Sequence, residues 1–205
     1  YIEEWIQFHL LVGVDHVYLY NDACTDNTCA ILEPYIQQGL VDLHNAPKVN
    51  SPTDSWEPRQ LASYKDAIKK ATGQAAWVAL IDSDEILVPM KHFDIPLILN
   101  TYFSQADGIY VNWCNFGTSQ KTIPKGRPIY TELTSCSNRR HCRNWVGKSL
   151  VRPEAVNLNA PFDYVHFFKL LPGKRFVDGN TKPANITNDL YQTNQRHDSK
   201  YLRIN

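Results

Sequence analysis

The sequence lacks the features that mark several large classes of protein. Its 205 residues carry 21 Lys+Arg and 21 Asp+Glu, and the formal net charge of zero argues against a nucleic-acid-binding protein held by bulk positive charge. No apolar run approaches the length of a membrane span, and no secretory signal peptide is present. These absences favour the cytoplasm and leave the secretory pathway as the alternative location.

Cysteine is scarce and irregularly placed. The chain has five cysteines, and neither Cys24 with Cys29 nor Cys136 with Cys142 has the C-x-x-C spacing of a structural zinc site. An odd number at irregular positions suits reduced thiols better than a complete disulfide framework. The first residue is Tyr1 rather than Met, so we expect a piece of a longer polypeptide with further domains.

The composition is that of a globular domain. A content of 43% hydrophobic and 12% aromatic residues in 205 is enough for a sizeable core, and no repeat or linker divides the chain. We therefore expect a single domain over 1–205. Its first part is regular and its second is not, which suggests a nucleotide-binding half over 1–105 and an acceptor half over 106–205.

One stretch, 77–89, combines a buried strand with acidic residues. Five apolar residues, 77–81, lead directly into Asp82, Asp84 and Glu85. A short apolar run without alternation is typical of a strand buried on both faces, and the end of such a strand is where open α/β sheets bind ligands. On an extended backbone Asp82 and Asp84 point to the same side, although a turn would redirect either. Two such carboxylates suit Mg²⁺ or Mn²⁺, and the alternative is a solvated acidic turn.

The first half reads as alternating helices and strands. Apolar periodicity, capping residues and glycine stops predict this order: a helix over 1–12, a strand over 16–20, a helix ending near 38, a strand over 40–43, a helix over 58–73, the strand before Asp82, and a helix over 95–103. A strand, a helix and a second strand in that order imply a parallel crossover. The fold class expected is α/β, with a mixed, mostly parallel sheet flanked by helices.

The second half gives fewer predictions. Strands are expected over 109–113, 149–151 and 164–170, and the chain between 114 and 149 is irregular. The tail after Pro172 has no usable periodicity. The densest positive charge, which is either solvated surface or a phosphate-facing patch, comprises Arg139, Arg140, His141, Arg143 and Lys148.

Several motifs, in their joint order and spacing, resemble GT-A glycosyltransferases related to families 2 and 92, with small virus-encoded members among the most similar. The motifs are Glu4-Trp5-Ile6-Gln7-Phe8-His9, Gly13-Val14-Asp15-His16, Tyr18-Leu19-Tyr20-Asn21-Asp22, Ile81-Asp82-Ser83-Asp84-Glu85, Trp113-Cys114-Asn115-Phe116-Gly117-Thr118 and Gly147-Lys148-Ser149. The resemblance covers most of the chain to about Phe168. It implies an enzyme that moves a sugar, of the hexosyltransferase type, from a nucleotide-diphosphate donor to a hydroxyl of a glycan or glycoprotein acceptor.

The resemblance also assigns residues. It implies that Asp82 and Asp84 hold Mn²⁺ or Mg²⁺ on the donor diphosphate, that Asp22 contacts the base or ribose, and that His166 completes the metal shell. UDP-sugar is the donor expected. Lys148 is a candidate for the leaving diphosphate, because negative charge develops there as the sugar departs.

Two features depart from that pattern. GT-A domains usually begin with a strand ahead of the helix that corresponds to 1–12, and this chain has none. The acceptor-side carboxylate expected of an inverting enzyme is also missing between Asp107 and Glu132. Asp163 is the preferred candidate for the catalytic base because it precedes His166 by three residues, with Glu154 and Glu132 as alternatives. A retaining reaction would need no such base.

Two other functions fit parts of the sequence. A strand followed by Asp-x-Asp also begins haloacid-dehalogenase-like phosphohydrolases, but these want Thr or Val where this chain has Ile86, and their motif lies near the start of the domain. A noncatalytic sugar-binding module is the second alternative. Trp113, Phe116 and Trp145 are of the type that stacks on sugars, or they belong to the core.

Overall fold

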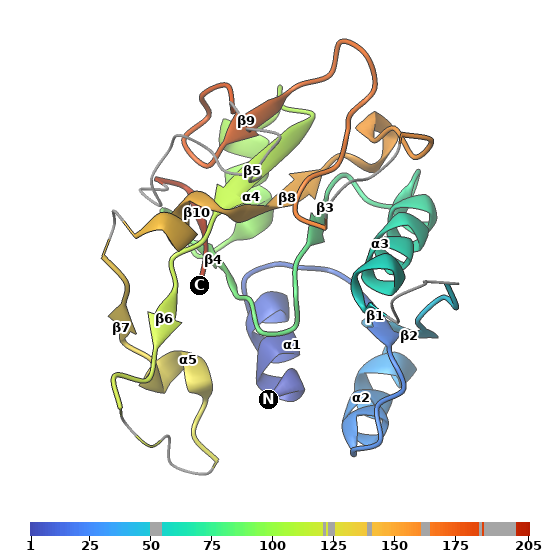
Figure 1. The fold of residues 1–205 in the computed structure, drawn as a ribbon, viewed down its shortest axis with the longest axis vertical. Helices are drawn as coiled ribbons and strands as arrows, with labels where there is room; N and C mark the ends of the chain where they lie inside the picture. Colours follow the sequence, from blue (N-terminus) through green and yellow to red (C-terminus); the bar gives the residue numbers. More distant parts are fainter. Residues whose placement is uncertain are drawn as a thin grey trace.

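The computed structural model describes residues 1–49, 55–120, 122, 126–138, 141–160, 165–184, 186 and 200–205. Asp163, Arg139 and Arg140, all named above, lie outside these ranges. Helices flank short strands throughout (Figure 1), so the α/β class predicted from the sequence is confirmed. None of the helices in the described ranges is long and apolar enough to cross a membrane.

The N-terminal part is a pair of strands with two helices. Its elements are α1 (Ile2–Leu11), β1 (Val17–Asn21), α2 (Thr28–Gln37) and β2 (Val41–Asn45). β1 and β2 pair in parallel with Val17 opposite Val41, as the strand-helix-strand order predicted. Helix α1 ends where Gly13 adopts a φ of +95°, and a side chain there would also meet the ring of Pro96.

Helix α3 (Glu57–Ala71) and strand β3 (Val78–Leu80) lead to the acidic turn. Pro58 lies in the first turn of α3, where its missing N–H costs nothing. Ile68 and Ala71 of α3 are buried, so this face packs into the protein. In β3, Leu80 is buried but Ala79 is exposed, which differs from the expected burial on both faces.

The largest sheet has the strand order β3-β8-β5-β9, in which β5 is Gly108–Asn112, β8 is Gly147–Val151 and β9 is Phe176–Asp178. β8 pairs antiparallel with both β3 and β5, and only β5 with β9 is parallel. This sheet is therefore mostly antiparallel, where a mostly parallel one was expected. The reason is that β8 comes from late in the chain and inserts between two earlier strands. Gly147 allows this, because a Cβ there would lie 2.1 Å from the carbonyl oxygen of Val111.

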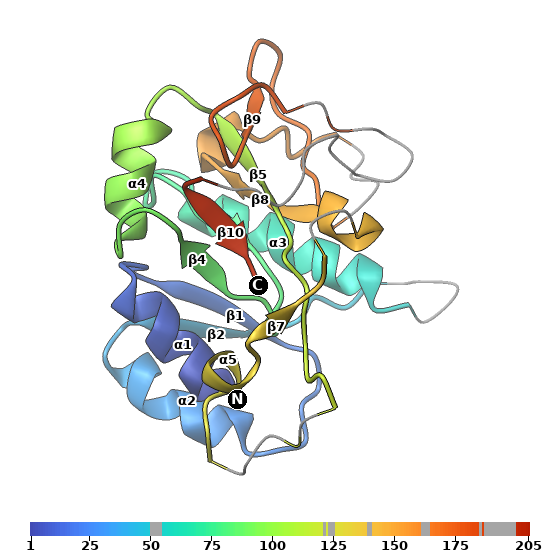
Figure 2. The same cartoon turned by 90° about the vertical axis from the view of Figure 1, so that its left-hand side faces the viewer.

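The remaining elements cover the edges. They are β4 (Leu87–Pro89) paired with β10 (Leu202–Ile204), α4 (Ile95–Tyr102), β6 (Phe116–Gly117) paired with β7 (Ser135–Cys136), α5 (Ile129–Glu132), and the short 3-10 helices η1 (Cys142–Trp145) and η2 (Pro153–Ala155). Figure 2 shows α4 at the left-hand edge of the molecule, next to β4. β6, α5 and β7 form an arm that lies apart from the sheet in Figure 1.

The tail differs most from the sequence predictions. Of the strand expected over 164–170, the described part, 165–170, forms no strand and is limited to isolated bridges, such as the one between Val156 and Leu170. β9 and β10 were not predicted. Both are three residues long, and each is held by a strand distant in sequence, so local periodicity carried no signal.

Candidate functional site

The acidic residues after β3 lie on a tight turn. The backbone N–H of Glu85 donates to the carbonyl of Asp82 at 3.1 Å, and the backbone N–H of Asp82 donates to Glu85 Oε2 at 2.8 Å. The indole N–H of Trp5 donates to the carbonyl of Glu85 at 2.6 Å, which fixes the turn to α1. The backbone is therefore not extended here, and Asp84 sits exposed at the tip.

One carboxylate oxygen of Asp82 receives three side-chain donors. Gln60 Nε2 lies 2.5 Å, Lys148 Nζ 2.8 Å and Tyr64 Oη 2.9 Å from Asp82 Oδ1. Gln60 and Tyr64 come from successive turns of α3, and Lys148 comes from β8. Within the described residues no donor reaches Oδ2, and the side chain of Asp82 is 33% exposed.

Lys148 is fully buried, and its ammonium is committed to the acidic turn. Besides Asp82, its Nζ lies 3.8 Å from Glu85 Oε2 and 5.8 Å from the ring centre of Tyr64. A buried ammonium requires such partners, because its desolvation would otherwise cost several kcal/mol. The predicted contact of Lys148 with a phosphate stays a prediction. In this structure its charge acts through Asp82.

Burial raises the pKa values of both Glu85 and Tyr64. Burial raises the pKa of the Glu85 carboxyl well above its usual range, and the nearby Lys148 partly offsets this. Burial, followed by the charge of Asp82, also raises the pKa of Tyr64, so its hydroxyl keeps its proton and donates. The Tyr64 hydroxyl therefore acts as a hydrogen-bond donor that stabilises the Asp82 carboxylate.

Asp84 differs from Asp82 in almost every respect. It makes no hydrogen bond or ion pair to any residue in the described ranges, and it is exposed to solvent. The pKa of Tyr1 is raised to about 12, mainly by burial and next by the negative charge of Asp84. Asp84 is thus an available oxygen ligand next to the N-terminal end of α1.

His166 is buried close to the same cluster. Its Nδ1 lies 2.9 Å from the carbonyl oxygen of Gly147, so the neutral ring donates from Nδ1 and carries its lone pair on Nε2. The edge of the imidazole meets Trp113 at 5.0 Å between ring centres. Burial and then the charge of Lys148 lower the pKa of His166 to about 4. The ring is therefore neutral at physiological pH, as a metal ligand must be.

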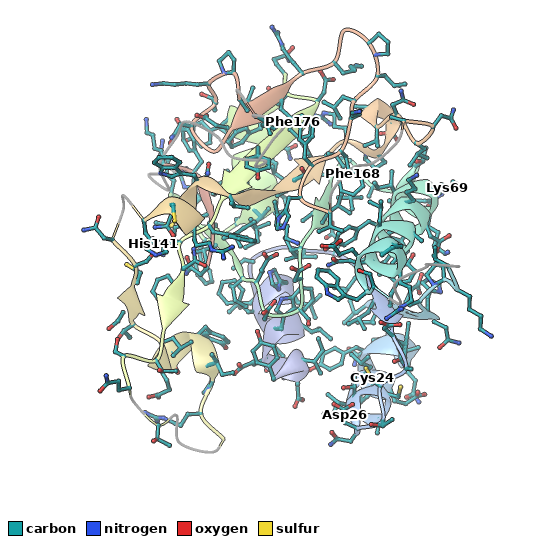
Figure 3. The ribbon with its side chains drawn as sticks, viewed as in Figure 1. Cys24, Asp26, Lys69, His141, Phe168 and Phe176 are labelled. Carbon is teal, nitrogen blue, oxygen red and sulfur yellow. The ribbon has the colours of Figure 1, made fainter. Side chains whose placement is uncertain are left out.

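Asp22, at the end of β1, forms an exposed ion pair with α3. Arg59 Nε lies 3.0 Å from Asp22 Oδ1 and its Nη2 lies 3.0 Å from Oδ2, which is the two-pronged geometry of guanidinium and carboxylate. The loop after Asp22 turns back on itself, with the Cys24 N–H donating to Asn21 Oδ1 at 2.7 Å. Cys24 and Asp26 lie at the outer end of the molecule beside α2 (Figure 3).

A cleft of about 1210 Å³ joins Asp22 and Asp82, whereas Asp84, Lys148 and His166 are not among the residues that line it. It is lined by β1 and β3, which are not hydrogen-bonded to each other, and by residues of α1, α2, α3 and α4. Tyr1, Asp22, Arg59, Gln60 and Asp82 all line it. The two strands that carry the predicted donor-binding carboxylates therefore open onto one cavity.

The donor atoms can be tested against a divalent metal. No group of three His, Cys, Asp or Glu side chains with the geometry to hold a metal is present among the residues described. Mg²⁺ and Mn²⁺, however, are commonly held by one or two carboxylates, with substrate phosphates and water supplying the other ligands. Asp82 Oδ2 and the exposed Asp84 fit that arrangement. His166 is close enough to Asp82 for the carboxylate charge to act on its pKa.

The other candidates have structural partners. Glu154 Oε1 accepts the backbone N–H of Gly73 at 3.0 Å, and Glu132 pairs with Arg127 at 2.9 Å, so neither faces the cleft as an unengaged carboxylate. Trp145 is exposed and Trp113 is half-buried against His166. His141 caps η1 and Arg143 belongs to it; both are exposed, and Figure 3 shows His141 far from α3.

Sequence reasoning did not single out Gln60, Tyr64 or Arg59. The signal available was their spacing: residues 60 and 64 are four apart on an amphipathic helix, so both project from one face. A polar pair on a face that is otherwise apolar is a reason to look for a buried partner. The partner itself, 18 and 22 residues away, could not be read from the sequence.

Comparison with known proteins identifies the family. The family model named Glycosyltransferase family 92 matches residues 1–188. A glycosyltransferase family 92 protein of Ricinus communis is 26% identical over 215 residues, covering 99% of this chain and 35% of that protein. One from Oryza sativa subsp. japonica is 27% identical over 183 residues, covering 87% and 29%. The chain belongs to glycosyltransferase family 92, and it spans about a third of the length of these curated relatives.

Solved structures show only weak similarity. The S. aureus TarS 1–349 crystal structure aligns over 80% of this chain and 50% of that chain, with a TM-score of 0.42 and 14% identity. A second TarS structure, in complex with UDP, aligns over 75% and 44%, with a TM-score of 0.40 and 16% identity.

Proposed function

We propose that this domain transfers a sugar from a nucleotide-diphosphate donor, with UDP-sugar as the first candidate, to a hydroxyl of a glycan or glycoprotein acceptor, and that a divalent metal takes part. The observation that carries the proposal is the convergence of Asp22, Asp82 and α3 on one cleft in a chain of glycosyltransferase family 92. The choice of uridine rests on the sequence resemblance.

In this proposal the protein's own residues bind and orient the donor. Asp84 and Asp82 Oδ2 would hold Mn²⁺ or Mg²⁺, with His166 as a further ligand. When bound, the metal would supply Lewis-acid stabilisation of the charge that develops on the leaving diphosphate. Lys148 adds a fixed positive charge beside Asp82 in a buried setting, where electrostatic stabilisation is stronger than in water.

The nucleoside would lie toward Asp22 and Arg59 at the end of β1. Both side chains line the cleft, and an exposed carboxylate and guanidinium are suited to ribose hydroxyls and phosphates. The donor-site residues come from both parts of the sequence, since Lys148 and His166 lie beyond residue 105. For acceptor activation Asp163 remains the candidate base, and a correctly placed base would contribute roughly 10²- to 10⁴-fold.

Nucleotide binding tests the proposal directly. A thermal-shift titration of UDP with and without Mn²⁺ should raise the Tm in a metal-dependent way. A ligand that binds only the folded state adds about 2.7 kcal/mol of stability at a hundredfold excess over its Kd. ADP and uridine serve as controls for the base and the diphosphate.

Two other results would replace the proposal. Binding of free sugars without any response to UDP or Mn²⁺ would indicate a sugar-binding module. Hydrolysis of a phosphate monoester in the presence of Mg²⁺, abolished by Asp82→Asn, would indicate a phosphohydrolase, although the family match does not favour it.

A further inference from the structure

The side chain of Asp82 accepts hydrogen bonds from three different residues, and all three bonds go to the same oxygen. Gln60, Tyr64 and Lys148 donate to Oδ1, while no donor from the described residues reaches Oδ2. A carboxylate oxygen has about two lone-pair sites, so three donors exhaust the capacity of Oδ1. A ligand in the cleft therefore has only Oδ2 to bind.

Tyr64 connects this oxygen to the rest of the site. Its hydroxyl donates to Asp82 and lies 3.2 Å from Gln60 Nε2, so the hydroxyl can accept from the amide while it donates to the carboxylate. Its ring meets Phe168 edge to face at 6.0 Å between ring centres. Phe168 is fully buried and lies two residues after His166 (Figure 3 places Phe168 between α3 and the sheet).

The position of Tyr64 is itself well determined. It belongs to the 15-residue helix α3, whose neighbouring residue Ser63 and next turn, Ala67 and Ile68, are buried. A hydroxyl carried by a packed ring on a rigid helix has little freedom, whereas a carboxylate following a strand end can rotate about its χ angles. The hydrogen bond from Tyr64 therefore restricts the rotation of the Asp82 carboxylate.

We propose that Tyr64 is a positioning residue of the donor site: with Gln60 and Lys148 it occupies Oδ1 of Asp82 and so presents Oδ2 to the metal and diphosphate. This inference rests on the proposed function. Tyr64 also lines the cleft, and the role proposed for it is exerted through Asp82.

The test compares two tyrosines. Tyr64→Phe removes the hydroxyl and keeps the ring that packs on Phe168. Tyr102→Phe is the matched control, because Tyr102 is not among the residues that line the cleft, and its hydroxyl contacts the ring of His92 at 3.3 Å and the ammonium of Lys91 rather than Asp82. UDP affinity is measured calorimetrically, with and without Mn²⁺, in wild type and in both variants.

The expected result is about a tenfold weaker affinity for UDP with Mn²⁺ in Tyr64→Phe, the size expected for one hydrogen bond to a charged group. The affinity of Tyr102→Phe should stay within twofold of wild type. If Tyr64→Phe also stays within twofold, the inference is wrong. If wild type itself shows no Mn²⁺-dependent binding of UDP, the proposed function fails and this inference with it.

A double-mutant cycle separates positioning from general damage to the fold. In an Asp82→Ala background, or Asp82→Asn if the alanine variant does not melt cooperatively, Tyr64→Phe should change UDP affinity by less than twofold, measured by ligand-observed NMR to reach weak binding. A tenfold loss that persists without the Asp82 carboxylate would show that Tyr64 acts by another route, and would overturn the proposal.

Discussion

The ends of β1 and β3 open onto the same cleft, yet the carboxylates that follow them differ in exposure and in the burial of their ion-pair partners. Asp22 after β1 is half-exposed, with a side-chain exposure of 50%, and pairs with Arg59, which is 26% exposed. Asp82 after β3 pairs with Lys148, which is completely buried. Solvent screens the first pair, so it contributes little to stability, whereas removing one partner of the second leaves a charge buried alone. We infer that the side chains of Asp22 and Arg59 can rearrange when a ligand binds, whereas Asp82 is already held in position by its buried partner.

Loss of the buried ammonium should give the largest effect. Lys148→Met keeps the length of the side chain and leaves Asp82 and Glu85 without their cation, so we expect the free energy of unfolding to fall by about 3 kcal/mol, measured by urea denaturation. Lys174→Met is the control, because Lys174 is exposed and pairs with Asp107 at 3.0 Å. Its loss should cost about 1 kcal/mol or less. Equal losses for both variants would show that the buried ion pair of Lys148 contributes no more to stability than an exposed ion pair.

Asp84 should matter for ligand binding and not for the fold. Asp84→Asn keeps the shape and removes the charge that a divalent metal needs, so UDP affinity with Mn²⁺ should fall at least about 100-fold, which corresponds to about 2.7 kcal/mol. The Tm without ligand should stay unchanged, since the side chain is exposed and forms no hydrogen bond or ion pair with any described residue. Glu33→Gln, an exposed carboxylate on α2, is the calorimetric control. Undiminished Mn²⁺-dependent binding would take Asp84 out of the site.

Because of His166, the free energy of unfolding should fall at acidic pH. Its pKa in the folded protein is lowered to about 4, below the unfolded value of about 6.5, so the unfolded state binds the proton first as pH falls. Its contribution to stability is complete above pH 6.5 and is lost between pH 6.5 and 4. By pH 5 the loss should be on the order of 2 kcal/mol.

Urea denaturation of the metal-free protein between pH 5 and 8 measures this dependence. His166→Asn should flatten it in part. His9→Asn should do so too, since burial also lowers the pKa of His9 to about 4. If the profile of His166→Asn parallels that of wild type, the imidazole is not held neutral by the fold.

The same pKa sharpens the test of metal ligation by His166. The ring is already neutral at pH 5.5, so UDP affinity with Mn²⁺ should not change through protonation of His166 between pH 5.5 and 8. The decisive measurement is His166→Ala at pH 7.5, which should weaken Mn²⁺-dependent binding while leaving metal-free UDP binding unchanged. Equal losses with and without the metal would mean that His166 has a structural role and does not bind the metal.

The smallest effect is expected at the β1 end. Asp22→Ala breaks an exposed ion pair and should change the free energy of unfolding by about 1 kcal/mol or less. UDP affinity should fall severalfold, and the ratio of affinities with and without Mn²⁺ should stay constant, because Asp22 would contact the nucleoside. An unaltered UDP affinity would show that the pair with Arg59 serves only the loop after β1.

Local patterns predicted the first half of the fold well. The helix over 1–12 ends at Gly13, whose positive φ is a property of glycine, and α3 begins next to Pro58. The parallel pairing of β1 and β2 follows from the helix between them. The position of the acidic residues after a strand also follows from composition alone, because apolar residues bury and carboxylates do not.

The pairing of strands could not be predicted in the same way. β8 is antiparallel to both neighbours and fully buried, although the sequence before it is irregular. β9 and β10 are too short for periodicity to distinguish them from loops. Their pairing depends on contacts with β5 and β4, which are distant in sequence.

The sequence by itself determined the α/β class, the positions of Asp22, Asp82 and Asp84 at strand ends, and the resemblance to glycosyltransferases that family 92 membership confirms. Tertiary structure decided which carboxylate is held and which is exposed. Lys148 looked like part of a surface basic cluster, and only the insertion of β8 beside β3 brought its ammonium 2.8 Å from Asp82. The reason is that burial and hydrogen-bond partners depend on residues far apart in the chain, whereas helix ends, turns and strand composition depend on near neighbours.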